Sequence, residues 1–264
     1  MSAVVAAEGE AQQDHAKALS QWLRERNAGL PDGMRLALGD DGLSLRDGED
    51  RRVRADWESI DIRSGAGRSQ RAPVYRAIAS KNTRLAGLRV LDATAGWGED
   101  ALLLLAAGCV VTAIERDPVI ALLLADSARR AEAAGLIEGL SQRLTVLHSE
   151  TASWLQGGPA EVLYGPDVDP SAGWDAAMFD PMFAAERKAA ERQAMRSLRA
   201  IVSEIAKPAN DDTEVLRALL ESGIRRVAVK RSRKAPAIPH PPSTDGVHHL
   251  IEGKGFRFDV YLKV

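Results

Sequence analysis

The sequence predicts an α/β protein built on a mostly parallel, twisted sheet. Three observations favour this fold class: strand-like and helix-like segments alternate from Leu88 onward, a glycine-rich turn follows the first of those strands, and two strand-like segments come last in the sequence. Alternating strands and helices are typical of a parallel sheet with helices on both faces. The last two strands are expected to add an antiparallel hairpin at one edge.

Two smaller regions precede this alternating pattern. Residues 1–62 are expected to form a small N-terminal α+β subdomain, with an amphipathic helix within residues 5–26 and a β-hairpin that turns at Asp40-Asp41-Gly42. Residues 63–87 are expected to form a basic linker and a helix, because they begin with a glycine-containing basic stretch and Pro73 suits the first turn of a helix. Residues 88–264 then form the large domain.

The elements of the large domain follow from hydrophobic patterning and helix-start signals. Pro118, for example, directly follows a buried strand and is expected at the first position of a helix. Strands are expected at residues 88–93, 109–115, 144–148, 174–180, 225–230, 248–252 and 256–262, and helices at 99–107, 118–134, 184–206 and 213–222.

The composition excludes several classes of protein. Hydrophobic residues make up 45% and charged residues 27% of the 264, which is typical of a folded globular chain. The single cysteine excludes an internal disulfide, and a net charge of -2 predicts no strong bulk attraction to nucleic acid or membrane. We expect a cytoplasmic protein without a membrane span. No metal site is expected, because adjacent His248 and His249 would point to opposite faces of a strand.

The densest signal lies in LDATAGWGEDA, residues 91–101. Asp92 ends a buried strand there, and Gly96 and Gly98 form the turn into the next helix. Glycine lets the backbone pass close to a ligand, and ligands of doubly wound sheets bind beyond the carboxyl ends of the strands. Glu115 ends the second strand, where a carboxylate can accept hydrogen bonds from both hydroxyls of an adenosine ribose.

Three interpretations of this loop compete. It is a tight turn without a ligand, a dinucleotide site, or a site for S-adenosylmethionine (SAM). The spacing G-x-G-x-x-A of residues 96–101 satisfies the dinucleotide fingerprint, so the loop alone does not exclude NAD. However, Asp92, Glu99 and Asp100 would repel a pyrophosphate, whereas carboxylates suit the cationic methionine part of SAM. The acidic loop therefore favours SAM.

A second motif, Asp180-Pro181-Met182-Phe183, follows the fourth strand. It is similar to the D/N-P-P-Y/F/W motif of methyltransferases that modify exocyclic amino groups. A carboxylate and a backbone carbonyl can accept the N–H groups of a poorly nucleophilic amine and orient its lone pair. Proline stiffens the loop, and Phe183 offers a face for stacking of a flipped base. The alternative is that Asp-Pro merely ends the strand and Phe183 lies in the core.

Taken together, these segments resemble the RsmJ-type 16S ribosomal RNA guanine-N2 methyltransferases. The resemblance is carried by VLDATAGWGEDALLLLAAGCVVTAIERDPVIALLL, LTVLHSETASWL, MFDPMF, RRVAVKR and GFRFDVYL, and it covers roughly residues 60–264. It implies a Rossmann-like class I SAM-dependent methyltransferase fold, SAM as cofactor without a metal, and ribosomal RNA or the small ribosomal subunit as partner.

The resemblance also implies site residues. It adds Glu99, Asp100, Glu115, Arg116, Glu150, Thr151 and Asp180 as cofactor contacts to Asp92, Gly96 and Gly98. The catalytic candidates, from the motif after the fourth strand, are Asp180, Pro181 and Phe183. The sequence departs from the family pattern at Glu99, which is often basic, at Glu150-Thr151, which are often small hydroxyl residues, and at Ala184, which replaces a proline. Backbone contacts are the alternative to side-chain contacts at residues 99, 150 and 151.

Two basic clusters are candidates for RNA binding. Residues 63–84 contain basic and no acidic residues, and a second basic cluster follows the fifth strand on the expected ligand side. The candidate residues are Arg63, Arg68, Arg71, Lys230, Arg231 and Arg233. The alternative is a solvated surface.

These observations predict a SAM-dependent enzyme that methylates the exocyclic N2 of a guanosine in small-subunit ribosomal RNA. The alternatives are an N-methyltransferase for another amino group, such as DNA adenine or a protein glutamine, and a SAM- or RNA-binding protein without turnover. An NAD-dependent oxidoreductase is disfavoured by the acidic loop.

Overall fold

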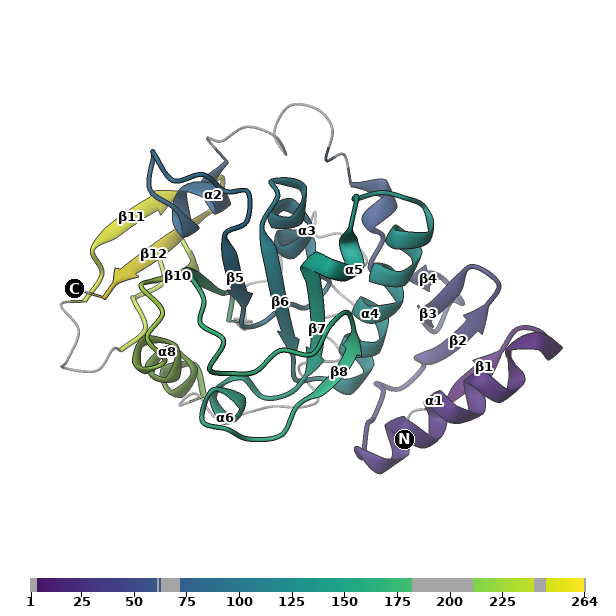
Figure 1. The fold of residues 1–264 in the computed structure, drawn as a ribbon. Helices are drawn as coiled ribbons and strands as arrows, with labels where there is room; N and C mark the ends of the chain where they lie inside the picture. The colour runs from purple at the N-terminus through teal and green to yellow at the C-terminus, as the bar shows by residue number, and fades with distance from the viewer. Residues whose placement is uncertain (1–3, 61, 63–71, 182–210, 240–245, 264) are drawn as a thin grey trace.

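The computed structural model describes residues 4–60, 62, 72–181, 211–239 and 246–263. It confirms the predicted α/β class: an eight-stranded sheet in the order β11-β12-β10-β9-β5-β6-β7-β8 forms the centre of the molecule (Figure 1). The strands are β5 Arg89–Asp92, β6 Val110–Glu115, β7 Leu144–His148, β8 Glu161–Tyr164, β9 Ala176–Phe179, β10 Arg226–Ser232, β11 His249–Glu252 and β12 Phe256–Leu262.

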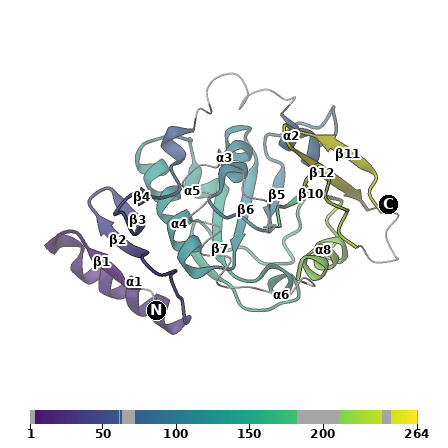
Figure 2. The same ribbon diagram turned by 180° about the vertical axis from the view of Figure 1, so that it is seen from behind.

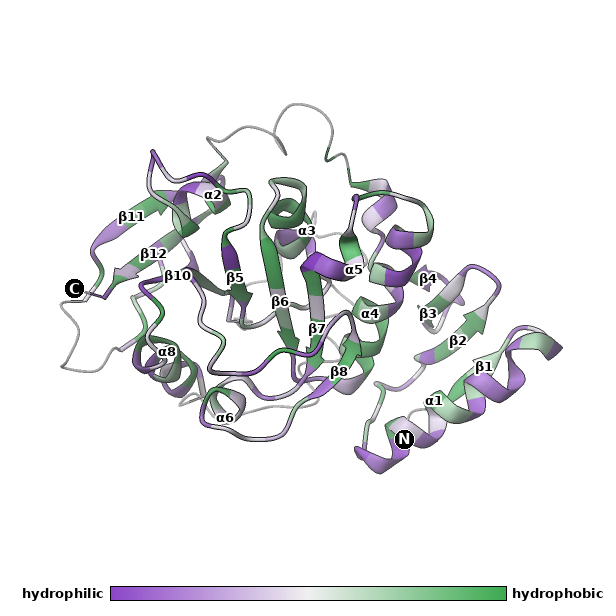
Figure 3. Ribbon diagram, viewed as in Figure 1, coloured by the Kyte–Doolittle hydropathy of each residue, from purple (hydrophilic) through white to green (hydrophobic). Residues whose placement is uncertain are grey.

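The five strands from β10 to β7 in this order run parallel, and the predicted C-terminal hairpin adds β12 antiparallel to β10. Consecutive residues of the central strands belong to different cores: Val90 packs on one face of the sheet and Leu91 on the other. Because both faces are covered, the central strands carry apolar residues at consecutive positions, as in β6 (Figure 3).

Helices cover both faces of the sheet (Figures 1 and 2). One core contains side chains of α2, α3 and α4, and the other contains side chains of α6 and α8. The helices are α2 Pro73–Ile78, α3 Glu99–Ala106, α4 Pro118–Ala133, α5 Leu140–Arg143, α6 Thr151–Leu155 and α8 Asp211–Glu221. Pro73 and Pro118 open α2 and α4 as predicted. The helix predicted at residues 184–206 lies outside the described part of the chain.

The N-terminal residues form a second, four-stranded sheet in the order β1-β2-β3-β4. Its elements are β1 Val5–Ala7, η1 Glu10–Gln12, α1 Gln13–Glu25, β2 Arg35–Gly39, β3 Gly42–Arg46, β4 Arg52–Val53 and η2 Trp57–Ser59. This sheet packs on α4 (Figure 2). Leu36 and Leu45 belong to the same core cluster as Leu124 of α4.

Two local predictions were wrong. Residues 5–7, expected within a helix, form β1, because Val5 pairs parallel with Leu36 and its N–H donates to the Ser20 hydroxyl at 2.9 Å. The segment between β7 and β9, for which no strand was predicted, contains the edge strand β8, which pairs antiparallel with β7. The glycines on either side of this short strand obscure its pattern in the sequence.

Candidate active site

The candidate cleft lies where the strand order of the large sheet reverses. The chain moves outward from β5 to β6 and β7 on one side, and from β9 to β10 on the other, so the carboxyl ends of β5 and β9 border a crevice. All the residues expected at the cofactor line this cleft: Asp92, Gly96, Gly98, Glu99, Asp100, Glu115, Arg116, Glu150, Thr151 and Asp180. Pro181, Trp97, Phe179 and Lys230 also line it.

The glycine loop has the backbone conformation that its sequence requires. Gly96 and Gly98 adopt φ angles of 53° and 72°, in the left-handed region that favours glycine. Gly98 is the N-cap of α3, and a Cβ atom there would lie 2.6 Å from side-chain atoms of Trp57 and Leu124. The loop is therefore both turned and closely packed from behind.

Glu115 ties the end of β6 to this loop. Its Oε2 accepts the Gly96 N–H at 2.9 Å, and its Oε1 accepts the Asp117 N–H at 2.8 Å. The side chain is almost completely buried, and burial raises the pKa of its carboxyl to about 7. Each carboxylate oxygen retains acceptor capacity, so Glu115 can also accept from ligand hydroxyls in the cleft.

Three carboxyl groups and one ammonium meet at the other end of the cleft. Lys230 Nζ lies 2.8 Å from Asp100 Oδ2 and 2.9 Å from Asp180 Oδ2. Burial lowers the pKa of Lys230, but Asp100 and Asp180 outweigh that effect and hold the pKa above its usual value. Burial, with the nearby Asp100, raises the pKa of Asp92 to about 7.

Asp180 is held at the end of β9 by backbone and side-chain contacts. Its N–H donates to the Thr94 hydroxyl at 2.8 Å, and its side chain remains 40% exposed. Burial raises the pKa of the Asp180 carboxyl, whereas Lys230 lowers it. Asp180, the residue that the sequence predicts to accept an N–H of the amine, thus lies in the cleft with the Lys230 ammonium beside its carboxyl group.

The side chains of Glu150 and Thr151 have structural partners. Glu150 is the N-cap of α6 and accepts the N–H groups of Ala152 and Ser153 at 3.1 and 2.7 Å. The Thr151 hydroxyl donates to the Ala93 carbonyl at 2.6 Å. These bonds fix the strand-to-helix turn after β7 and favour backbone contacts to a ligand there.

The basic residues after β10 differ in their surroundings. Lys230 was expected to contact phosphate, but its ammonium is bound by two carboxylates inside the cleft. Arg231, expected on the surface, is buried and donates to the Pro236 carbonyl at 2.6 Å. Arg233 is exposed and pairs with Glu252 at 3.0 Å. Arg63, Arg68, Arg71 and Phe183 lie outside the described residues.

Two contacts near the cleft were not foreseen from the sequence. Lys230 was predicted only as a phosphate ligand, and the structure places its ammonium between Asp100 and Asp180, because it lies near the carboxyl end of the strand beside β9. No role was predicted for Trp57, whose indole contacts the glycine loop. Among the described residues, no cluster of His, Cys, Asp and Glu could hold a metal ion, and no helix has the length and apolar character of a membrane span.

Known proteins resemble this chain in sequence and structure. Residues 24–263 match the family model described as "Putative SAM-dependent methyltransferase". Ribosomal RNA small subunit methyltransferase J of Marinobacter nauticus is 35% identical over 87% of this chain and 77% of its own length, and that of Ectopseudomonas mendocina is 33% identical over 96% and 92%. The crystal structure of a SAM-dependent methyltransferase from Neisseria gonorrhoeae superposes with a TM-score of 0.63 and 24% identity, covering 98% of this chain and 95% of that one, which supports the shared fold.

Proposed function

The chain belongs to the family of SAM-dependent methyltransferases that includes ribosomal RNA small subunit methyltransferase J, and on this premise we propose that it methylates the exocyclic N2 of a guanosine in small-subunit ribosomal RNA. The observation that carries the proposal is the position of Asp180. This carboxylate lies at the carboxyl end of β9, in the same cleft as the glycine loop and Glu115.

The residues of the cleft fit SAM chemically. Glu115 suits the two ribose hydroxyls, because it lines the cleft and each of its oxygens, which accepts one backbone N–H, can accept a further hydrogen bond. Asp92 and Asp100 suit the cationic methionine part, because they supply more negative charge than the single ammonium of Lys230 neutralises. Arg116 and the turn at Glu150-Thr151 border the cleft on the side of β6 and β7, where the adenine of a nucleoside held by Glu115 would lie.

SAM, when bound, supplies an electrophilic methyl group on a sulfonium. The chain's residues must then present the amine about 3–3.5 Å from that methyl, in line with the departing sulfur. In this proposal Asp180 accepts one N–H of the guanine N2, and a carbonyl of the Pro181-Met182 segment accepts the other. Phe183 is expected to stack on the base, as the motif predicts.

Asp180 acts mainly by orientation and electrostatics. The N2 lone pair of guanine is delocalised into the ring, so a carboxylate beside the N–H raises the electron density on nitrogen. The same carboxylate stabilises the positive charge that develops on nitrogen during attack. The methylated amine then loses its proton readily, and no strong base is needed beforehand.

Two relatives carry the name ribosomal RNA small subunit methyltransferase J, and this name supports RNA rather than DNA or protein as the substrate. Arg233, and Arg63, Arg68 and Arg71 as predicted from the sequence, are the proposed phosphate ligands. We further propose that the protein works in the cytoplasm, where small subunits assemble.

The test is single-turnover transfer of labelled methyl from SAM to small-subunit ribosomal RNA, naked or assembled, followed by nucleoside analysis. The proposal expects label in N2-methylguanosine, and a loss of rate of about 100-fold or more with Asp180→Asn. Label on adenine or on protein, or near-wild-type turnover by Asp180→Asn, would reject it.

A further inference from the structure

We propose that Trp57 is a positioning residue for cofactor binding, through which the N-terminal sheet holds the glycine loop in its binding conformation. Trp57 belongs to η2, which follows the N-terminal sheet and is distant in sequence from the loop. The inference concerns the family's cofactor and not the RNA substrate, so its outcome is independent of the proposed target.

The indole of Trp57 contacts the loop in two ways. Its Nε1 donates to the Trp97 carbonyl at 2.8 Å, and only 1% of the residue is exposed. Its ring also fills the space behind Gly98, where an added Cβ would lie 2.6 Å from Cζ2. Trp97 lies between the two glycines of the loop. The Trp57 side chain therefore holds the carbonyl of Trp97 and packs against the next residue, Gly98.

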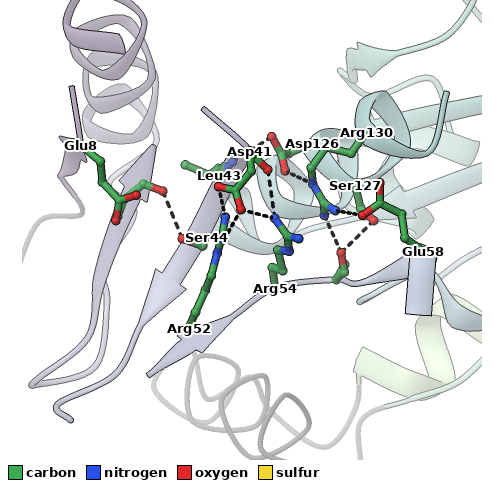
Figure 4. Close-up of polar contacts among 12 residues, drawn as sticks. Glu8, Asp41, Leu43, Ser44, Arg52, Arg54, Glu58, Asp126, Ser127 and Arg130 are labelled. Carbon is green, nitrogen blue, oxygen red and sulfur yellow. Dashed lines mark hydrogen bonds and ion pairs between the residues drawn. The ribbon is translucent and has the colours of Figure 1, made fainter. Parts of the chain in front are cut away.

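The segment that carries Trp57 is itself anchored to α4 (Figure 4). The Ala55 carbonyl accepts from the Ser127 hydroxyl at 2.9 Å and from Arg130 at 2.6 Å. Arg130 also donates to Asp126 at 2.9 Å and lies 3.4 Å from Glu58. Residues 55–58, which we call the brace, are therefore attached to the helix that begins directly after the Glu115 turn.

The N-terminal sheet is attached to the same helix. The Leu43 N–H of β3 donates to Asp126 Oδ1 at 2.9 Å, and this carboxylate also accepts from Arg130 (Figure 4). The sheet, the brace and α4 thus form one connected unit, and Trp57 carries the contact from this unit to the glycine loop.

The loop is consequently held from two sides. Glu115 accepts the Gly96 N–H on the cleft side, and Trp57 donates to the Trp97 carbonyl from behind. Glycine residues lose more conformational freedom on ordering than other residues, so a loop with two left-handed glycines is costly to order. A loop that is ordered before binding spares the cofactor that cost and raises its affinity.

The brace is tested with Trp57→Phe, which keeps an aromatic ring but removes the N–H donor and part of the indole that fills the space behind Gly98. The matched control is Trp174→Phe, because Trp174 is also buried, donates its indole N–H to Thr112 at 3.3 Å, and does not line the cleft. SAM affinity is measured by calorimetry on the full chain without RNA, alongside melting temperature and hydrogen exchange of the Gly96 and Gly98 amides.

We expect Trp57→Phe to weaken SAM binding about three- to tenfold and to accelerate exchange of the loop amides, as loss of one ordering hydrogen bond predicts. Trp174→Phe should lower the melting temperature without either effect. Equal weakening in both variants, or unchanged SAM affinity in Trp57→Phe, would overturn the proposal.

If Trp57→Phe does not fold, a milder variant tests the same attachment of the brace. Ser127→Ala removes one of the two hydrogen bonds to the Ala55 carbonyl and leaves that of Arg130. Faster exchange of the loop amides with about twofold weaker SAM binding is the expected result. Wild-type exchange and affinity in this variant would contradict the brace.

Discussion

Lys230 pairs with Asp180 at 2.9 Å inside the cleft, and its ammonium lowers the pKa of this carboxyl against the larger, raising effect of burial. The same ammonium lies 2.8 Å from Asp100, so it links the start of α3 to the end of β9. An ammonium has three N–H donors, so Lys230 can serve both carboxylates at once. The pair therefore favours the ionised form of the proposed amine-binding carboxyl and holds its side chain in place.

Replacing Lys230 should slow methyl transfer and alter its pH dependence. Lys230→Gln removes the cation that lowers the pKa of Asp180, so that pKa rises and the acidic limb of the rate profile moves to higher pH. Single-turnover rates across pH at saturating RNA measure this shift. Lys254→Gln, an equal change of charge on the exposed C-terminal hairpin, should leave the profile unchanged; an unmoved profile in Lys230→Gln would refute the pairing role.

SAM affinity should depend on pH through Glu115. Burial raises the pKa of this carboxyl to about 7, and hydrogen bonds from ribose hydroxyls favour its ionised form. Affinity should therefore be highest above pH 7 and fall as the pH drops below 7. Glu115→Ala should weaken SAM binding roughly tenfold or more, because each charge-assisted bond contributes about 1.5–3 kcal/mol.

Calorimetric titrations at several pH values check both effects of Glu115. The Glu115→Ala variant should also show a flatter pH dependence than the wild type, with Asp92 accounting for what remains, since its pKa is likewise raised to about 7. If Glu115→Ala binds SAM with wild-type affinity, Glu115 does not contact the cofactor.

Glu150 should affect stability more than cofactor binding. Glu150→Ala removes the N-cap of α6 and should lower the free energy of unfolding by about 1 kcal/mol. Glu150→Asp, which can still cap the helix, should recover most of that loss. Urea unfolding together with SAM titration distinguishes the roles: a loss of SAM affinity much larger than the loss of stability would show direct side-chain contact with the cofactor.

Arg231 and Arg233 should behave differently despite their proximity. Arg231→Ala removes the hydrogen bonds that the buried Arg231 guanidinium donates to the Pro236 carbonyl and should destabilise the protein by about 1 kcal/mol. Arg233→Ala should leave stability nearly unchanged and reduce the salt dependence of RNA binding by about one unit of slope. Filter binding across salt concentrations checks this, and an unchanged slope in Arg233→Ala would exclude a phosphate contact.

Much of the cleft could be predicted because its residues lie at the ends of strands. Once the alternation from Leu88 places the parallel strands, Asp92, Glu115 and Asp180 must meet at one edge of the sheet. The short edge strand β8 could not be predicted, since its pairing with β7 depends on tertiary structure rather than on its own sequence pattern.

The partners of several charged and aromatic side chains likewise could not be predicted from the sequence. Lys230 and Arg231 are neighbours on one strand, and alternation alone does not say which of them faces the carboxylates. The contact between Trp57 and Trp97 joins segments 40 residues apart and requires the N-terminal sheet to pack on α4. Such contacts emerge only when the packing of the two sheets is known.

The most direct test of the proposed function is nucleoside mass spectrometry of small-subunit ribosomal RNA from cells with and without this gene. The account predicts that one N2-methylguanosine disappears when the gene is removed, returns with the wild-type gene, and does not return with Asp180→Asn. An unchanged nucleoside content after removal, or full restoration by Asp180→Asn, would contradict it.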